Sequence, residues 1–392
     1  MAERVADVRY RWNMSVEARV LVVVTLALLA LGLGTVYSAS AVAARQAGQS
    51  SATFFLKQLG GVLVGLVVFA IFAKVDAEQW NRWAWPLMIL SIVMLTLVIL
   101  PFTESIAPRW HGSRRFLVGA SLQPSEFGKI AVIVWTAMLI VKKGDALKGL
   151  TKGLLPFLII VGLLDVLAAL EPDLSVSMTY TLIMAIILFA GGVRIGHFVV
   201  LGIISIPLLW TQFQRLNYAL LRMTAFFDPG SAPPHLDYQL KQSLIAVGSG
   251  GIFGVGFGQG RQQYGFLPLA YDDFIAANIG EERGFIGLAF VILMFALFAV
   301  LGFRIARTAR SQFLQLTAIG ITVTIVLTAY LHIGVAIGLL PTTGLTLPFI
   351  SYGRSNLILS MLMTGILVNI GSTREKVIGG RATDPSFALE RA

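Results

Sequence analysis

The chain has 392 residues, of which 56% are hydrophobic and 13% charged, with a formal net charge of +10 and a mean hydropathy of +0.80. Soluble domains carry about 25% charged residues, so this composition excludes an ordinary soluble globule and indicates one membrane domain. The chain has no cysteine, which excludes disulfide frameworks and thiolate metal sites. The basic excess is typical of membrane loops that face an anionic leaflet, and we expect no nucleic-acid partner.

The first apolar run, from Val20 to Val36, follows a basic segment and precedes the small residues Ser38 to Ala41. The same order occurs in cleaved signal peptides. However, the run is longer than the hydrophobic region of about 7–15 residues that is usual in such peptides. The sequence therefore favours a retained first membrane helix, with cleavage as the alternative.

Runs of about 20 apolar residues are long enough to cross a bilayer as helices. The sequence predicts an all-α integral membrane protein with about ten transmembrane helices. We expect a cytoplasmic segment at 1–19, a polytopic membrane domain at 20–372 and a cytoplasmic tail at 373–392. The predicted spans are Val20–Tyr37, Phe54–Ala73, Ala84–Leu100, Phe127–Val141, Leu154–Leu170, Ser175–Ala190, His197–Trp210, Phe285–Phe303, Leu314–Leu339 and Leu357–Ile370.

Lysine and arginine concentrate in alternate connections between these spans. If the N-terminus is cytoplasmic, the connections on the inside include Lys74 with Arg82, the lysines at 142–152, and the arginines at 304–310. This distribution is the one that the positive-inside rule requires. An even number of spans then places both termini in the cytoplasm.

Two connections on the outside are long, at residues 101–126 and 211–284. Long loops in compact domains are usually functional or disordered, and the second is too apolar for disorder. Apolar residues recur at helical spacing from Leu216 to Phe227, which predicts an amphipathic helix at the membrane interface.

The strongest local signal is the pair of charges at the start of the fourth span, Glu126 and Lys129. Three residues apart, they share one helix face. Ionisable groups within spans are costly and usually face a bundle interior or a wet cavity. The pair therefore indicates a polar cavity wall, or alternatively an ion pair that extends to the interface.

Two other segments carry candidate groups on the outside. Glu171-Pro172-Asp173 lies between two spans, where proline favours a turn and Asp173 is a candidate cap of the following helix. The glycine-dense stretch 248–260 matches neither the P-loop nor the dinucleotide-binding spacing. It favours close helix packing or re-entrant backbone.

The adjacent carboxylates Asp272 and Asp273 precede the eighth span. A carboxylate at a low-dielectric boundary can have its pKa raised and serve as a general base. The alternative is a negative charge that favours a helix N-terminus. Near the ninth span, two prolines and several glycines between 338 and 355 break the helical pattern and indicate a cavity wall.

Several segments together resemble the SEDS family (shape, elongation, division and sporulation proteins). These segments occur in family order across nearly the whole chain, and their combination is specific although no single one is. They are Gln123–Glu126, Pro172–Leu174, Tyr238–Ser243, Asp273–Ile275 with Gly280–Glu282, and Leu339–Gly353.

The resemblance implies a SEDS-type fold and a peptidoglycan glycosyltransferase that polymerises lipid II on the outer face of the bacterial cytoplasmic membrane. It implies a class B penicillin-binding protein, a transpeptidase, as partner, together with other division proteins and membrane lipids. Val36–Ser40 and Pro341–Leu345 are more similar to the division branch, which implies septal wall synthesis. An elongation polymerase is the alternative.

The resemblance also implies site residues. The family's essential aspartate precedes Phe-Ile and corresponds to Asp273, and the arginine of its first outer segment corresponds to Arg115. Its Glu and Lys at the fourth span correspond to Glu126 and Lys129. Further candidates for substrate binding are Ser351 and Tyr352, and candidates for supporting the site are Asp272, Glu281, Glu282 and Arg222.

The chain departs from the family pattern near these residues. Leu269-Ala270-Tyr271-Asp272 replaces the usual Glu-Ala-His-Thr, and Gly353-Arg354-Ser355-Asn356 replaces Gly-Gly-Ser-Ser. Single departures are Glu171 for Gln, His332 for Asn and Phe116 for Trp. These departures leave the match at the expected catalytic residue, Asp273, unchanged, but they alter the groups expected around the donor substrate.

The implied mechanism is a single displacement with inversion. Asp273 takes the proton of the acceptor's 4-hydroxyl as that oxygen attacks C1 of the donor, and undecaprenyl pyrophosphate leaves. Arg115 and Lys129, or a divalent cation such as Mg²⁺ or Mn²⁺, stabilise the leaving group, and Glu126 holds Lys129 in place.

Two rival functions share this membrane fold. A lipid II flippase or transporter would have inverted repeats, and no clear repeat occurs in the sequence. A scaffold that only recruits division proteins would tolerate Asp273→Asn.

Overall fold

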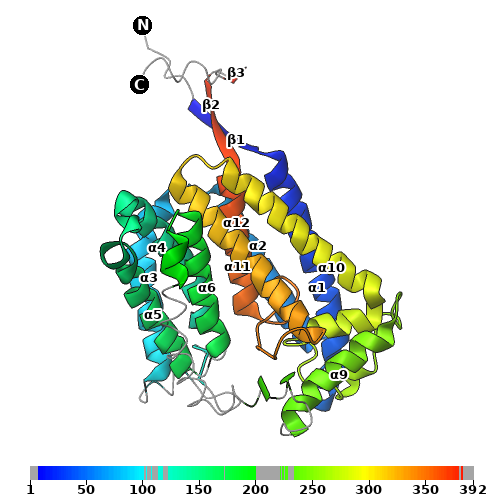
Figure 1. Ribbon diagram of the computed structural model, residues 1–392. Coiled ribbons are helices and arrows are strands. Elements are labelled where there is room, and N and C mark those ends of the chain that lie inside the picture. Colours follow the sequence, from blue (N-terminus) through cyan, green and yellow to red (C-terminus); the bar gives the residue numbers. More distant parts are fainter. Residues whose placement is uncertain are drawn as a thin grey trace.

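The computed structural model describes residues 8–100, 103, 107, 114–117, 122–171, 173–199, 221, 223–224, 226–227, 234–378 and 381–382. The helices stand side by side as a bundle, and a narrow β-ribbon projects from one end (Figure 1). The elements are β1 (Val8–Met14), α1 (Val16–Gln46), α2 (Thr53–Lys74), α3 (Gln79–Ile99), α4 (Pro124–Lys143), η2 (Gly144–Lys148), η3 (Leu150–Leu154), α5 (Leu155–Leu170), α6 (Leu174–Ala190), α9 (Pro234–Gly250), η4 (Gln262–Tyr264), α10 (Ile275–Arg307), α11 (Gln312–Ala336), α12 (Arg354–Ile370), β2 (Ser372–Ile378) and β3 (Arg381–Ala382).

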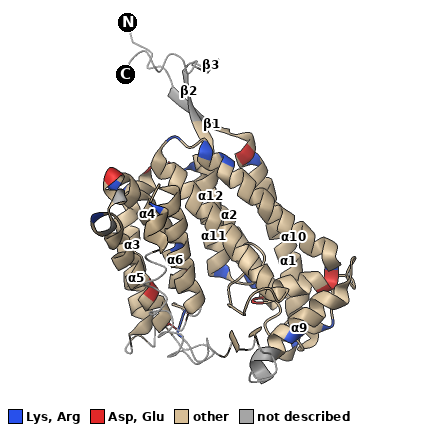
Figure 2. Ribbon diagram, in the orientation of Figure 1, with Lys and Arg blue, Asp and Glu red and all other residues tan. Residues whose placement is uncertain are grey.

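The helices confirm a polytopic α-helical membrane protein. In the described part of the chain, six helical stretches are long and apolar enough to cross a membrane: α1, α2, α3, α10, α11 and Thr151–Leu170. Helices α6 and α12 are also apolar but shorter. Charged residues lie mostly near the ends of the helices, whose middle parts are almost free of them (Figure 2). The predicted span His197–Trp210 and the predicted amphipathic helix from Leu216 lie largely outside the described residues.

Local signals explain where two helices begin and break. The Ser15 side chain accepts a hydrogen bond from the Ala18 N–H at 3.1 Å, so α1 begins at Val16, four residues before the predicted start. Helix α10 is interrupted by a kink at Gly284, where the backbone is non-helical and φ is +64°. Only glycine adopts such a backbone readily, so Gly284 separates an outer segment from the part that was predicted as a span from Phe285.

Small residues let α2 and α12 pack closely. A Cβ atom at Gly65 would lie 3.1 Å from the Met361 side chain, and one at Gly365 would lie 2.7 Å from the Phe69 carbonyl oxygen. Close backbone approach of this kind is the usual basis of helix association in membranes, where no hydrophobic driving force acts between helices. The contact places the N-terminus of α12 beside the outer end of α2, where the candidate site lies.

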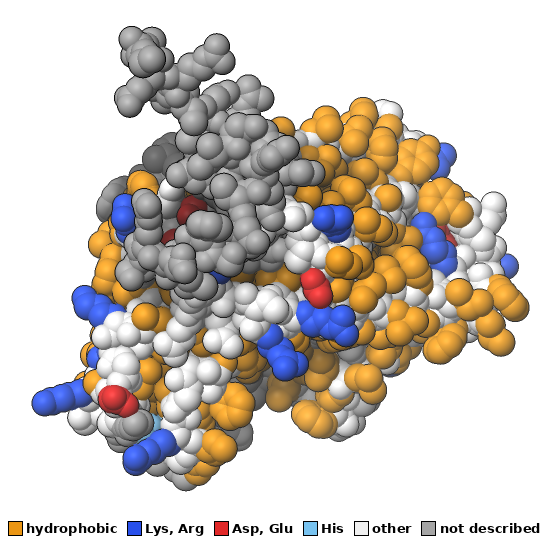
Figure 3. All heavy atoms as spheres, turned by 90° about the horizontal axis from the view of Figure 1, so that it is seen from above, with side chains coloured by type: hydrophobic (Ala, Val, Ile, Leu, Met, Phe, Trp, Pro, Cys, Tyr) orange, Lys and Arg blue, Asp and Glu red, His pale blue; other side chains and the backbone are white. Residues whose placement is uncertain are grey.

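The β-ribbon joins the two ends of the chain. Strand β1 pairs antiparallel with β2, and the Ser15 N–H donates to the Gly371 carbonyl at 3.1 Å. The first and last described segments therefore lie at one end of the bundle, as an even number of spans requires. Lysine and arginine side chains are scattered over this face (Figure 3). No local sequence pattern predicts these strands, because their pairing connects distant segments.

Candidate functional site

The Glu126–Lys129 pair is a buried ion pair at the start of α4. Pro124 occupies the first turn, and the Lys129 Nζ lies 2.7 Å from the Glu126 Oε1. Lys129 is only 2% exposed, which excludes the alternative of an ion pair extending to the interface. The Asn356 side chain of α12 donates to the Glu126 Oε2 at 3.0 Å, so a residue that departs from the family pattern completes the contact.

Arg115 contacts the turn between α5 and α6. Its Nε donates to the Glu171 carbonyl oxygen at 3.3 Å, and its Nη1 lies 3.8 Å from the Asp173 Oδ2. Asp173 accepts the Val176 N–H at 3.3 Å, which confirms its predicted role as the cap of α6. We call Arg115, Glu126, Lys129, Glu171, Asp173 and Asn356 the polar cluster.

Two carboxyl groups of the polar cluster have raised pKa values. Burial raises the pKa of Glu171 to about 9, with a further increase from the neighbouring Asp173 charge and a smaller opposing effect of Arg115. Burial also raises the pKa of Asp173, and Arg115 is the main opposing influence. The Glu171 carboxyl is therefore protonated at neutral pH.

The predicted catalytic residue lies in a turn held by the signature segment of residues 347–352. The Ser351 hydroxyl donates to the Asp272 carbonyl at 2.8 Å, and the Tyr352 N–H donates to the Tyr271 carbonyl at 3.0 Å. The Tyr271 and Tyr352 rings also pack, with centroids 5.8 Å apart. We call residues 271–273 with Ser351 and Tyr352 the aspartate turn.

The two aspartates of this turn have different surroundings. Both residues are partly exposed as a whole, and they differ in the surroundings of their carboxyl groups. The Asp272 Oδ1 is buried and has no hydrogen-bond partner among the described residues. Burial raises the pKa of Asp272 well above its ordinary value, and the adjacent Asp273 charge raises it further. Asp272 therefore favours the neutral form beside Asp273.

Gln58 of α2 is a site residue that the sequence analysis missed. It is 1% exposed, its Nε2 donates to the Ser351 carbonyl at 2.9 Å, and its Oε1 accepts the Gly353 N–H at 3.3 Å. The side chain therefore fixes the backbone that holds the aspartate turn. A glutamine within an apolar run was the only sequence signal for it.

We expect Gln58→Met to lower both thermal stability and activity, because two buried backbone groups lose their partner. Each unpaired group costs about 1–3 kcal/mol. Thermal unfolding in detergent and lipid II polymerisation measure the two effects. Gln315→Met, at an exposed position of α11, is the control. Unchanged thermal stability and activity of Gln58→Met would show that the hydrogen bonds of Gln58 to Ser351 and Gly353 are dispensable.

The start of α12 connects the aspartate turn with the polar cluster. Tyr352 belongs to the first and Asn356 to the second, and Ser355 between them accepts the Gln123 N–H of the α4 cap at 3.0 Å. The structure thus gathers Arg115, Glu126 and Lys129 on one side of this segment and the two aspartates on the other.

Two predicted supporting residues lie elsewhere. Glu281 accepts the Arg261 N–H at 2.7 Å and also that of Gln262, so it holds the loop before the aspartate turn. Glu282 accepts a hydrogen bond from the Ser38 hydroxyl of α1. Both act as structural links rather than as charges that favour a helix N-terminus. Arg222 lies outside the described residues.

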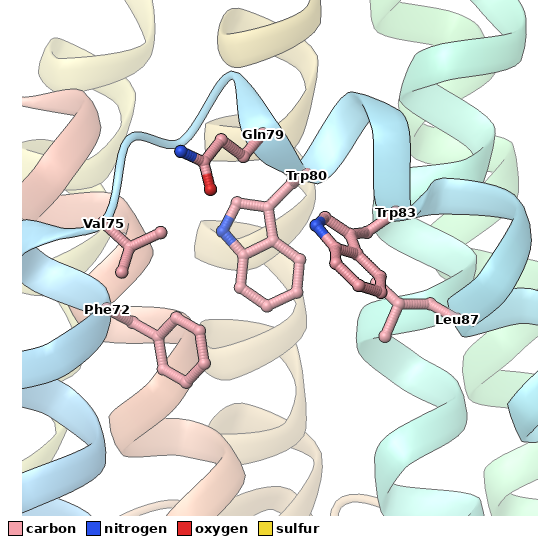
Figure 4. A pocket seen from close by; sticks show the side chains of 6 residues that line it. All are labelled: Phe72, Val75, Gln79, Trp80, Trp83 and Leu87. Carbon is pink, nitrogen blue, oxygen red and sulfur yellow. The ribbon is translucent and has the colours of Figure 1, made fainter.

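No cluster of metal-binding side chains marks the site in the described part of the chain. The described residues contain no group of three His, Cys, Asp or Glu side chains that could hold a metal ion. The predicted divalent cation therefore has no assigned ligands and stays a prediction. A cavity of about 230 Å³ lies at the opposite end of α2, lined by Phe72, Val75, Gln79, Trp80, Trp83 and Leu87 (Figure 4). Its apolar lining suits lipid chains rather than a charged sugar donor.

Comparisons with known proteins give a consistent result. The family model for FtsW, RodA and SpoVE, described as "Cell cycle protein", matches residues 18–376. The chain is 39% identical to the probable peptidoglycan glycosyltransferase FtsW of Trichlorobacter lovleyi, over 90% of this chain and 92% of that protein. It is 37% identical to stage V sporulation protein E of Bacillus subtilis, over 89% and 95% of the two chains.

Solved structures share the fold. A chain from a study of how a peptidoglycan synthase complex coordinates polymerization and crosslinking matches with a TM-score of 0.73 and 22% identity. This match covers 90% of the present chain and 97% of the other. The rod shape determining protein RodA of Thermus thermophilus matches with a TM-score of 0.62 and 21% identity, over 90% and 95%. At such identities the structures support the SEDS-type architecture alone.

Proposed function

The chain belongs to the family of FtsW, RodA and SpoVE cell cycle proteins, and we propose that it is a peptidoglycan glycosyltransferase that polymerises lipid II. The observation that carries the proposal is the aspartate turn. A partly exposed carboxylate lies at the outer end of a membrane bundle, fixed by the most distinctive sequence segment of the chain. Relatives over about nine-tenths of the chain bear the name of this activity.

In the proposed reaction, the Asp273 carboxylate accepts the proton of the acceptor's 4-hydroxyl while that oxygen bonds to C1 of the donor sugar. The C1–oxygen bond to undecaprenyl pyrophosphate breaks, and the diphosphate leaves with the electron pair. The partial exposure of Asp273 lets a substrate hydroxyl reach it. A base placed within hydrogen-bond reach contributes about 10²–10⁴-fold to such a step.

The leaving group is anionic, so it requires electrostatic stabilisation more than protonation. Arg115 is the proposed bidentate phosphate ligand, because its planar guanidinium matches phosphate geometry. Lys129 supplies a second positive charge, and Glu126 and Asn356 hold it in place. Ser351 and Tyr352 are proposed to line the acceptor side of the site.

We further propose a role in septal wall synthesis, with a class B penicillin-binding protein and other division proteins as partners. The names of the FtsW relatives support the division role over elongation. The shared fold of a chain from a synthase complex supports a transpeptidase partner. The expected place is the cytoplasmic membrane at the division septum.

The decisive measurement is lipid II polymerisation by purified protein with its cognate penicillin-binding protein. Asp273→Asn is expected to abolish polymer, because an amide cannot accept the proton. Asp272→Asn should retain most activity, since that carboxyl already favours its neutral form. Polymer formation by Asp273→Asn would remove the proposed base. A folded wild-type complex that makes no polymer would favour a flippase or a scaffold.

A further inference from the structure

Glu171 is an unusual group in the polar cluster. It ends α5 and is 2% exposed, and neither carboxyl oxygen has a hydrogen-bond partner among the described residues. Its own backbone carbonyl, in contrast, accepts the Arg115 Nε at 3.3 Å. The side chain thus lies buried beside the guanidinium that the proposed mechanism uses, without forming a hydrogen bond to it.

Titratable groups from four elements lie in this region. The charges that act on Glu171 itself are those of Arg115, from the segment before α4, and Asp173, from α6. Glu126 and Lys129 of α4 act on Asp173, and Asp165 of α5 acts on the neutral Tyr180 of α6. Within the polar cluster each positive charge has an acidic partner: Arg115 pairs with Asp173 at 3.8 Å, and Lys129 pairs with Glu126 at 2.7 Å. An ionised Glu171 would add a third negative charge and leave the cluster with a net charge of −1.

We propose that Glu171 is a positioning residue that acts as a neutral acid and keeps the polar cluster free of net negative charge, so that Arg115 and Lys129 can bind an anionic diphosphate. This inference rests on the proposed function, since it concerns the diphosphate of the donor substrate. Glu171 does not touch the reacting atoms. It controls the electrostatic potential that the diphosphate meets, and thereby sets an upper pH limit for substrate binding.

The direction of the pH effect follows from the geometry and from the raised pKa of about 9 at Glu171. Below that value the carboxyl is neutral and the cluster binds an anion. Above it, the carboxylate repels the diphosphate, so KM should rise while kcat changes less. Glutamine has nearly the same shape as glutamic acid and cannot ionise, so Glu171→Gln should remove the upper pH limit for substrate binding.

The test compares wild type, Glu171→Gln and Asp165→Asn in lipid II polymerisation between about pH 7 and about pH 10. We expect the wild-type KM to rise by about tenfold for each pH unit above the pKa of Glu171. The Glu171→Gln KM should stay level over the same range. Asp165→Asn should follow the wild type, because Asp165 is paired with Thr181 at 2.6 Å instead of lying beside Arg115. An equal alkaline rise in Glu171→Gln would overturn the proposal.

Infrared titration gives a readout that does not depend on activity. Because Asp272 also favours its neutral form, the measured quantity is the difference spectrum: wild-type protein at neutral pH should show a component of the carboxylic-acid carbonyl absorption that Glu171→Gln lacks and Asp165→Asn retains. This component should disappear as pH passes about 9. Absence of this difference at neutral pH would mean that Glu171 is ionised and would refute the inference. If the band titrates as expected but no variant polymerises lipid II, the proposed function fails instead.

Discussion

Lys129→Met is expected to destabilise the protein by about 3–5 kcal/mol, because it leaves Glu126 as an unpaired charge in a buried position. The 2.7 Å ion pair and the 2% exposure of Lys129 make this one of the largest effects in the molecule. Polymerisation should be lost as well, since the substitution removes a positive charge from the proposed diphosphate site. Thermal unfolding in detergent and lipid II polymerisation measure the two losses.

The double variant Glu126→Gln/Lys129→Met separates structure from function. A neutral pair carries no unpaired buried charge, and the Gln side chain can still bond to Asn356, so we expect most of the stability to return. Activity should remain absent, because the positive charge is still missing. Recovery of polymerisation in the double variant would show that Lys129 has only a structural role.

Gly250→Ala is expected to be strongly damaging, although it adds only one methyl group. A Cβ atom there would lie 1.9 Å from the Gly280 carbonyl oxygen, so α9 and α10 would have to separate. Overpacking of this kind costs about 1–3 kcal/mol, and more where backbone is involved. Because α10 begins two residues after Asp273, the displacement should also reduce polymerisation.

Gly248→Ala is the matched control on the same helix. A Cβ atom at Gly248 would meet nothing within 4 Å, and alanine favours a helix by about 1 kcal/mol over glycine. We expect wild-type or slightly higher thermal stability and normal polymer length. Equal stability of the two variants would contradict the close contact between α9 and α10.

The spans and the buried pair could be predicted because their signals are local. Apolar runs of about 20 residues identify membrane helices, and Glu126 and Lys129 share a helix face by spacing alone. The Asp173 cap is also a local feature, since it acts on its own helix. The candidate roles of Asp273 and Arg115 came from the family resemblance, since neither spacing nor composition distinguishes them from solvated charges.

The remaining features depend on contacts between distant segments. Gln58 lies in an apolar run of α2, and its partners Ser351 and Gly353 become visible only when α12 packs beside it. The structural role of Glu281 could not be predicted, because its partner Arg261 lies twenty residues earlier on an irregular connection. The ribbon of β1 and β2 requires the two chain ends to meet. In each case a single local window contains one half of the contact.

The pairing of α2 with α12 has a consequence for biogenesis. Helix α2 emerges from the ribosome early and α12 near the end of synthesis, so the face of α2 at Gly65 lacks its α12 partner until translation is almost complete. Non-local contacts of this kind delay folding, because the closing segment must first arrive. During that interval Gln58, which is buried in the folded protein, has neither Ser351 nor Gly353 as a hydrogen-bond partner. A nascent chain that stalls before α12 would therefore be a natural target for membrane quality control.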